Sequence, residues 1–291
     1  AATAAAADTI TGGAGNDIFY STDAKLVADH VLKGGDGTDT LKIDDLSAIA
    51  DSQLENNTSI EVLTSDATGL SATLDVYAQA MGLTTVTFAG THADGVADTV
   101  TIQDDVTNNI TVNLDAGADT DDTNTVDATL YTGVLTVVAA VDTALNADAG
   151  VTSTLTGGTG TSDELKFVGD TYTAAQLGSV TAFEKFTITN DAAATVTIDN
   201  GTIADGKSFV IDGRAIVSSA NGLTFSAVLE ADGAVTVHGA TGADAITGTI
   251  SDLGDTISTY AGSDTITIGA AYLTTLDTID GGTGGTDTLT I

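Results

Sequence analysis

Several residue types are missing from this chain or nearly so. It has no Cys, Pro or Trp and one Met among 291 residues, and only seven Lys or Arg stand against 41 Asp or Glu. Without Cys there can be no disulfide framework, thiolate zinc site or thiol nucleophile. A formal charge of -34 would repel nucleic acid phosphates and anionic membrane surfaces, so no nucleic acid partner is expected. The apolar runs fall far short of the ~20 residues that span a bilayer, so no direct membrane insertion is expected.

The acidic residues are nearly all Asp, since only five of the 41 are Glu. Glu would prevail if the acids served only to solubilise helices, because Glu is the better helix former. Asp is favoured in turns and as a short, rigid oxygen ligand for hard cations. The excess of Asp therefore indicates turns and calcium. Adaptation to high salt is the alternative, but it does not predict the regular positions of these residues.

The chain contains an internal repeat of about 124 residues. Gly-Gly pairs begin at Gly34, Gly157 and Gly281, and similar sequence follows each pair (GGDGTDTLKI, GGTGTSDELKF and GGTGGTDTLTI). Residues 8–17 also match residues 255–264, two periods later. Such self-similarity is typical of repeat architectures. We divide the chain into the end of a preceding unit (1–33), unit one (34–156), unit two (157–280) and the start of a third unit (281–291), which suggests a piece of a longer array.

Strand patterns dominate the sequence. Thr alternates with β-branched or apolar residues, as expected for strands with one dry face and one wet face, at residues 85–88, 99–102, 110–114, 135–138, 195–198 and 265–268. One short helix is predicted over residues 70–82, with Gly82 as its C-cap, and short helical turns within 44–54 and 173–185. Aromatic content of 4% is low for a β-sandwich core. We therefore expect an all-β fold, either a β-solenoid or tandem β-modules, with minor short helices.

Two segments fit the calcium-binding nonapeptide GGxGxDxUx at every constrained position. They are GGAGNDIFY at 12–20 and GGDGTDTLK at 34–42. The glycines permit positive φ and let carbonyl oxygens converge, the Asp adds a carboxylate, and the apolar residue two positions later enters the core. Because Ca²⁺ takes six to eight oxygens, two stacked turns are needed for one cage.

Partial copies of the motif occur at 115–119, 157–163, 239–244, 261–264 and 281–287, with shorter echoes at Asp8, Asp98 and Asp255. A Gly/Asp turn that holds no metal is the alternative for each of them. The candidate Ca²⁺ ligands and turn glycines are Asp8, Gly13, Gly15, Asp17, Gly35, Asp36, Gly37, Asp39, Asp115, Gly117, Asp119, Gly158, Gly160, Asp163, Gly242, Asp244, Asp255, Gly262, Asp264, Asp280, Gly282, Gly284 and Asp287.

These motifs resemble RTX (hemolysin-type) calcium-binding repeats. Isolated RTX turns between Thr/Ala/Val-rich strands, with a GGxGTDxLxI turn leading to an x-Ile-Glu-x-Leu segment, resemble Gram-negative bacterial surface-layer (S-layer) proteins. The resemblance implies type I secretion, Ca²⁺-driven folding outside the cell and assembly into a lattice. The chain departs from a compact RTX roll, whose nonapeptides run without interruption, because a long segment separates Asp17 from Asp39. This departure leaves open which sites pair.

No catalytic motif is present. The sequence has no Gly-x-Ser-x-Gly elbow, HExxH or P-loop. His30, His92 and His238 each stand alone, and Arg214, the one Arg, is expected to pair with a nearby Asp. We therefore do not expect an enzyme.

Three functions fit these observations. The first is a calcium-dependent, self-assembling structural protein of the bacterial cell surface, a surface layer or filament whose partner is a second copy of itself. The second is a calcium-rigidified stalk of a large RTX adhesin, and the third is the stalk of a secreted enzyme. Any anchor to a surface polysaccharide would lie outside this segment.

Overall fold

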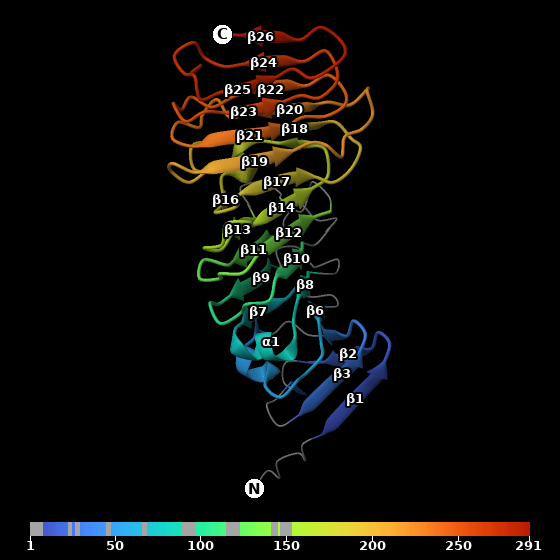
Figure 1. The fold of residues 1–291 in the computed structure, drawn as a ribbon. Helices are drawn as coiled ribbons and strands as arrows, with labels where there is room; N and C mark the ends of the chain where they lie inside the picture. Colours follow the sequence, from blue (N-terminus) through green and yellow to red (C-terminus); the bar gives the residue numbers. More distant parts are fainter. Residues whose placement is uncertain are drawn as a thin grey trace. The chain divides into compact units, whose positions relative to one another are not determined.

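The computed structural model describes residues 8–22, 25–26, 30–44, 48–65, 69–88, 97–114, 123–140, 145 and 153–291. The chain divides into two compact units, which we call the N-terminal unit (1–137 with 157–160) and the C-terminal unit (138–156 with 161–291). Each unit is built of short parallel strands stacked turn upon turn as a β-solenoid (Figure 1). The all-β solenoid predicted from the sequence is therefore confirmed within each unit.

The N-terminal unit contains one strand pair and two longer parallel sheets. Strand β1 (Thr9–Ala14) pairs with β3 (Val31–Asp36). One sheet has the order β2 (Ile18–Ser21), β4 (Thr40–Ile43), β6 (Val62–Ser65), β8 (Thr85–Thr87), β10 (Ile110–Asn113) and β12 (Leu135–Ala139). The other has the order β11 (Thr123–Asp127), β9 (Ala97–Ile102), β7 (Ser71–Leu74) and β5 (Ala48–Ile49).

The C-terminal unit also has two long parallel sheets. Its first sheet has the order β14 (Glu164–Phe167), β17 (Lys185–Ile188), β19 (Ser208–Asp212), β21 (Ala234–His238), β23 (Thr256–Ser258) and β25 (Thr278–Asp280). Its second sheet has the order β15 (Thr171–Tyr172), β18 (Ala194–Thr197), β20 (Leu223–Ser226), β22 (Ala245–Thr247), β24 (Thr265–Thr267) and β26 (Thr288–Thr290). Strands β13 (Thr154–Thr156) and β16 (Val180–Thr181) form a further pair.

Successive turns of the solenoid differ in length. Val210 pairs with Thr236, and Thr236 pairs with Thr256, so the first of these two turns is the longer. The loops take up the difference in length, so that strands keep their register. Within strands the alternation read from the sequence holds: β9 buries Val100 and Ile102 and turns Thr99 and Thr101 outward.

The core consists of apolar side chains stacked directly above one another. In the N-terminal unit, Leu41 pairs with Leu63 and Leu63 with Val86, all fully buried. In the C-terminal unit the rings of Phe186 and Phe209 meet edge to face with centroids 4.7 Å apart. Parallel strands place equivalent residues about 4.8 Å apart, so each apolar side chain packs on its counterpart in the next turn. A core stacked in this way can be filled with few aromatic side chains.

The short helices are only partly as predicted. Helix α1 covers Val76–Met81 and ends at Gly82, whose φ of 97° makes it the predicted C-cap. The prediction that the helix begins at residue 70 is wrong, because Ser71–Leu74 alternates exposed and buried residues and pairs with β9 as strand β7. The predicted helical turns are the 3-10 helix η2 (Asp51–Leu54) and helix α2 (Ala174–Leu177). None of the helices in the described residues is long and apolar enough to cross a membrane.

Truncation of Phe186 is expected to destabilise the chain strongly, because the ring is fully buried between Phe167 and Phe209. We expect Phe186→Ala to lower the free energy of unfolding by about 3–5 kcal/mol. Thr256→Ala at an exposed strand position is the control and should change it by less than about 0.5 kcal/mol. Urea unfolding followed by circular dichroism measures both. Equal effects of the two substitutions would contradict this description of the core.

Candidate functional site

The two complete nonapeptides lie directly on top of one another. Strand β1 runs through the first and β3 through the second, with Gly13 paired to Gly35 and Ala14 to Asp36. The segment from Asp17 to Asp39 therefore makes up one solenoid turn. The question of which turns pair, which the sequence left open, is thereby answered for these two. We call the turns at 12–17 and 34–39 the N-terminal stack.

The glycines adopt the backbone conformation that the motif predicts. The φ angles are 120° at Gly13, 105° at Gly15, 113° at Gly35 and 139° at Gly37, a region that favours glycine. A β-carbon on Gly35 or Gly37 would also lie within 3 Å of the carbonyl oxygen of Gly13 or Gly15, respectively. The carbonyl oxygens of one turn therefore point at the backbone of the next.

The turns at 261–264 and 281–287 form an equivalent pair, which we call the C-terminal stack. Gly262, Gly282 and Gly284 have φ angles of 146°, 76° and 88°. A side chain at the fifth position of the motif bridges the two turns in both stacks. In the N-terminal stack the N–H of Thr38 donates to Asn16 Oδ1 at 3.0 Å, and in the C-terminal stack the N–H of Thr286 donates to Ser263 Oγ at 3.1 Å.

Acidic side chains join successive turns in a series that we call the acid ladder. The backbone N–H of Asp17 donates to Asp39 Oδ1 at 2.8 Å, and that of Asp39 donates to Glu61 Oε2 at 2.8 Å. In each step an acid accepts the N–H of the corresponding acid one turn earlier. The C-terminal unit contains the same contact between Asp163 and Glu184, Asp244 and Asp264, Asp264 and Asp287, and Asp255 and Asp277, at 2.7–3.1 Å.

The ladder acids differ in how their two oxygens are satisfied. Oδ2 of Asp17, Asp39 and Asp264 is buried and has no hydrogen-bond partner in the described structure. Asp244 differs because Leu223 N–H donates to its Oδ1 at 2.7 Å and Ala240 N–H to its Oδ2 at 2.8 Å. A buried carboxylate oxygen without a partner is costly. One oxygen of each of the first three acids is therefore open to a cation, whereas both oxygens of Asp244 already accept backbone N–H groups.

Asp255 and Asp277 resemble Asp244, because both of their carboxylate oxygens accept hydrogen bonds. Asp255 accepts the N–H of Val235 on Oδ1 at 3.0 Å and that of Thr249 on Oδ2 at 2.9 Å. Asp277 accepts the N–H of Asp255 on Oδ1 and that of Thr274 on Oδ2. These two acids connect turns by hydrogen bonds alone.

In the N-terminal stack, the unpartnered carboxylate oxygen and a backbone carbonyl oxygen both border the first glycine of each motif. A β-carbon on Gly34 would lie within 3 Å of both Asp39 Oδ2 and the carbonyl oxygen of Ser59, and one on Gly12 within 3 Å of both Asp17 Oδ2 and the carbonyl oxygen of Gly34. Glycine is thus the residue that leaves room for these oxygens. Oxygen-only donors from side chain and backbone suit a hard cation such as Ca²⁺.

Side chains alone do not complete such a site. Among the described residues, no three His, Cys, Asp or Glu side chains are grouped so that they could hold a metal ion. A Ca²⁺ ion in the N-terminal stack would therefore depend on Asp17, Asp39 and backbone carbonyls together. In the C-terminal stack the corresponding carboxylate is that of Asp264.

The remaining predicted residues lie in different surroundings. Asp115, Gly117 and Asp119 fall outside the described residues. Gly158, Gly160 and Gly242 do not have the positive φ of the two stacks. Asp8, Asp36 and Asp280 are exposed, and the carboxylate of Asp280 accepts the N–H of Gly282 at 2.8 Å.

Three ladder residues were absent from the predicted set: Glu61, Glu184 and Asp277. A signal for the two Glu residues was present in the sequence. Glu61 follows Asp39 at the same spacing at which Asp39 follows Asp17, and the segment around Glu184 repeats the segment around Glu61. Asp277 belongs to no motif, and only the strand register reveals its role.

The outward positions of the first sheet of the C-terminal unit carry paired charges. Lys185 Nζ lies 3.1 Å from Glu164 Oε1 and 3.3 Å from Asp212 Oδ2. Arg214 donates from Nε to Asp212 Oδ1 at 2.9 Å and from Nη2 to Oδ2 at 2.6 Å. The side-chain hydrogen bonds from Arg214 hold the pKa of Asp212 well below its usual range. The predicted pairing of Arg214 with a nearby Asp is confirmed.

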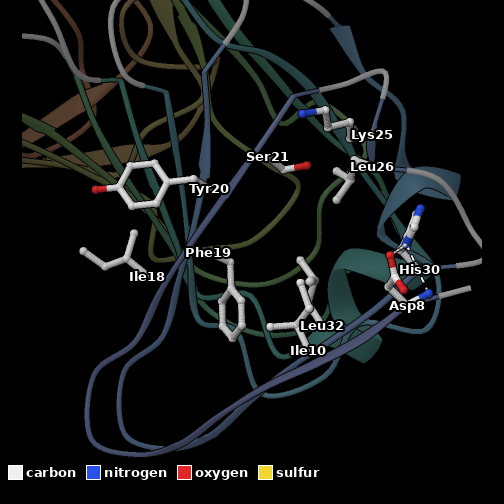
Figure 2. Close-up of a pocket in the computed structure, with 10 residues that line it drawn as sticks. All are labelled: Asp8, Ile10, Ile18, Phe19, Tyr20, Ser21, Lys25, Leu26, His30 and Leu32. Carbon is white, nitrogen blue, oxygen red and sulfur yellow. Dashed lines mark hydrogen bonds and ion pairs between the residues drawn. The ribbon is translucent and has the colours of Figure 1, made fainter.

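The N-terminal unit has a cavity of about 380 Å³ along β1, β2 and β3 (Figure 2). Its lining is mostly apolar, and the side chains of Ile10, Phe19 and Leu32 gather on one side of it. The polar contact at its rim is between the N–H of Asp8 and His30 Nδ1, at 3.3 Å. Phe19, Leu26 and Leu32 belong to the buried core, so we interpret the cavity as an open part of that core.

Comparisons with known proteins give no relative. A scan against protein-family models, a search of curated proteins and a search of solved structures each returned no match to this chain.

The pKa of Asp244 gives a testable dependence of stability on pH. Burial, and next the nearby charge of Asp264, raise this pKa from its ordinary value of 3.8 to about 6. Below pH 3.8 Asp244 is protonated whether the chain is folded or not. Above pH 6 it is ionised in both states, and the folded chain carries the cost of a buried charge. Its contribution to stability should therefore fall as the pH rises from about 4 to 6.

We expect Asp244→Asn to make the free energy of unfolding fall less steeply between pH 4 and 6, since Asn does not ionise. Urea titrations at several pH values in the presence of a chelator measure this slope. Asp205→Asn, at an exposed position, is the control and should keep the wild-type slope. Identical slopes for wild type and Asp244→Asn would show that this carboxyl titrates at an ordinary pH.

Proposed function

We propose that this chain is an extracellular structural protein of the bacterial cell surface that folds around Ca²⁺ and assembles with copies of itself. The observation that carries the proposal is the buried, unpartnered Oδ2 of Asp17, Asp39 and Asp264 in stacked Gly/Asp turns. The two complete RTX-type nonapeptides and the repeat of about 124 residues support the same interpretation. Type I secretion and an extracellular location belong to this proposal through the RTX resemblance.

The proposed role of calcium follows from the electrostatics of the ladder. Stacking places like charges one above another, so the empty turns repel and the chain is loosely folded. Extracellular modules typically bind Ca²⁺ with Kd values of about 10⁻⁴–10⁻³ M, so cytosolic calcium would leave these sites empty during export. Outside the cell each ion cancels two charges and joins two turns, and its binding free energy becomes folding free energy.

A calcium-rigidified adhesin stalk remains the second candidate. It uses the same ion chemistry and the same solenoid but requires no contact between copies. The cavity and the charged sheet give no catalytic arrangement that would favour a stalk attached to an enzyme. Self-association after calcium addition is the property that separates the first two candidates.

Calcium is expected to raise the melting temperature through the ladder acids that lack a partner. At ten times its Kd, one bound ion adds about 1.4 kcal/mol, which corresponds to a rise of roughly 2–4 °C in a chain of this size. Asp39→Asn keeps the size of the side chain but removes its charge, and we expect it to lose the share of the rise that the N-terminal stack contributes at millimolar calcium. Differential scanning calorimetry with calcium and with excess chelator measures the shift.

Two matched variants separate metal ligands from structural acids. Asp244→Asn and Asp98→Ala should keep the full calcium-induced rise, whereas Asp17→Ala should lose the same share of it as Asp39→Asn does. Magnesium at the same concentration tests simple charge screening and should give a much smaller rise. An equal loss of the rise in all four variants would show that the ligands are misplaced.

Assembly is expected to follow the filling of these sites. Dynamic light scattering of the wild-type chain should show large particles after addition of millimolar calcium and their loss after addition of a chelator. Asp39→Asn, under the same conditions, should form fewer or none. A compact monomer at all calcium concentrations would favour the adhesin stalk, and particles unaffected by chelator would contradict calcium-dependent assembly.

A further inference from the structure

The second sheet of the C-terminal unit, whose strands are labelled in Figure 1, turns two ranks of small, mostly polar side chains outward. The strand register places equivalent residues side by side across β15, β18, β20, β22, β24 and β26. The first rank is Thr171, Thr195, Thr224, Ala245, Thr265 and Thr288, and the second rank is Thr197, Ser226, Thr247, Thr267 and Thr290. We call these eleven positions the threonine face.

The threonine face contains no charged residue, although the chain carries 41 acidic and seven basic residues. Nine of its eleven positions are Thr, and the other two are Ala245 and Ser226. The outward positions of the first sheet in the same unit are different, since they include Glu164, Lys166, Lys185, Asp212, His238 and Asp280. A general preference for Thr in strands would give both sheets the same surface. A specific requirement on the second sheet is therefore indicated.

The face repeats regularly in two directions. Parallel strands lie about 4.8 Å apart, and residues two positions apart along a strand are separated by about 6.7 Å. Each threonine places one hydroxyl and one methyl group at its position in this two-dimensional array, and its branched side chain is stiff at χ1. In the fully described stretch 153–291, no side-chain hydrogen bond to protein engages these hydroxyls. They are available to an external lattice of hydrogen-bonding groups.

We propose that the threonine face binds ice. Crystalline water presents a neutral, repeating array of oxygen atoms, to which a neutral face that also repeats in two directions can bind at many points. Hydroxyls join such a lattice as donors and acceptors, and the methyl groups between them favour ordered water at the interface. The neutrality of the face matches a neutral partner. This proposal does not rest on calcium binding or on assembly.

Other ligand classes fit the face less well. An acidic or basic polymer would need opposite charges, and the face has none. A sugar chain is usually held by exposed aromatic rings, but Tyr172 and Phe225 on these strands are fully buried.

The test measures the gap between the melting and freezing points of a single ice crystal in a solution of the whole folded chain at millimolar calcium. The wild-type chain should lower the freezing point below the melting point, give faceted crystals and slow recrystallisation in a frozen film. Thr265→Tyr, at the exposed fifth of the six positions of the first rank, should lose most of the gap. Thr224→Tyr, two strands away, should do the same.

Thr256→Tyr is the matched control, because Thr256 holds an exposed position on β23 in the first sheet and the substitution is identical. It should keep the wild-type gap, and circular dichroism and melting temperature should be alike for all three variants. The proposal is overturned if the folded wild-type chain shows neither a gap nor slower recrystallisation, or if Thr256→Tyr removes the gap as fully as Thr265→Tyr. It is also overturned if sedimentation shows that copies pair through this face and no gap is found.

Discussion

Parallel hydrogen bonding between successive turns, in strict register, is the constraint on which the rest of each unit depends. Because every side chain lies about 4.8 Å from its counterpart in the next turn, like residues stack on like. Apolar residues gain from this, as the column Leu41, Leu63 and Val86 shows. Acidic residues do not, because stacked carboxylates repel. The solenoid resolves the repulsion by letting each ladder acid accept the backbone N–H of the turn before it, which places partial positive charge between neighbouring carboxylates.

The N–H from the preceding turn satisfies one carboxylate oxygen of each ladder acid. The residues around the acid decide whether its other oxygen also has a hydrogen-bond partner, so ladder acids fall into two kinds. At Asp244 the second oxygen meets the N–H of Ala240, and the acid is complete without a metal. At Asp39 the second oxygen is buried with no partner, and it and a backbone carbonyl oxygen both border Gly34. A buried carboxylate oxygen without a partner is unfavourable unless a cation or a proton satisfies it. A single backbone N–H thus decides whether a ladder acid is fully hydrogen-bonded or keeps one oxygen open to a cation.

The sequence predicts what depends on local pattern and fails where the outcome depends on register. Alternation of Thr with apolar residues is a local signal, and the strands at 85–87, 110–113 and 265–267 were predicted from it. Residues 70–74 also have a helical spacing, and pairing with β9 decided in favour of a strand. To predict that residues 12–17 stack on residues 34–39, one must know how many residues make up a solenoid turn, and the sequence alone does not give that number. The unpartnered oxygens of Asp17 and Asp39 depend on which N–H groups lie nearby, and no motif encodes that.

The acid ladder and the threonine face are joined in the chain. Asp244, Asp264 and Asp287 each directly precede a member of the first rank: Ala245, Thr265 and Thr288. The carbonyl oxygens of Asp244 and Asp264 accept the N–H groups of Thr265 and Thr288 at 2.9 and 2.8 Å. The ladder contact between Asp244 and Asp264 therefore fixes the alignment of β22 on β24 at the point where the rank begins. A slip of one residue would turn the core residue Ile266 outward and the threonines inward. The buried acids thus do more than carry charge, because their positions hold in register an uncharged face of this acidic unit.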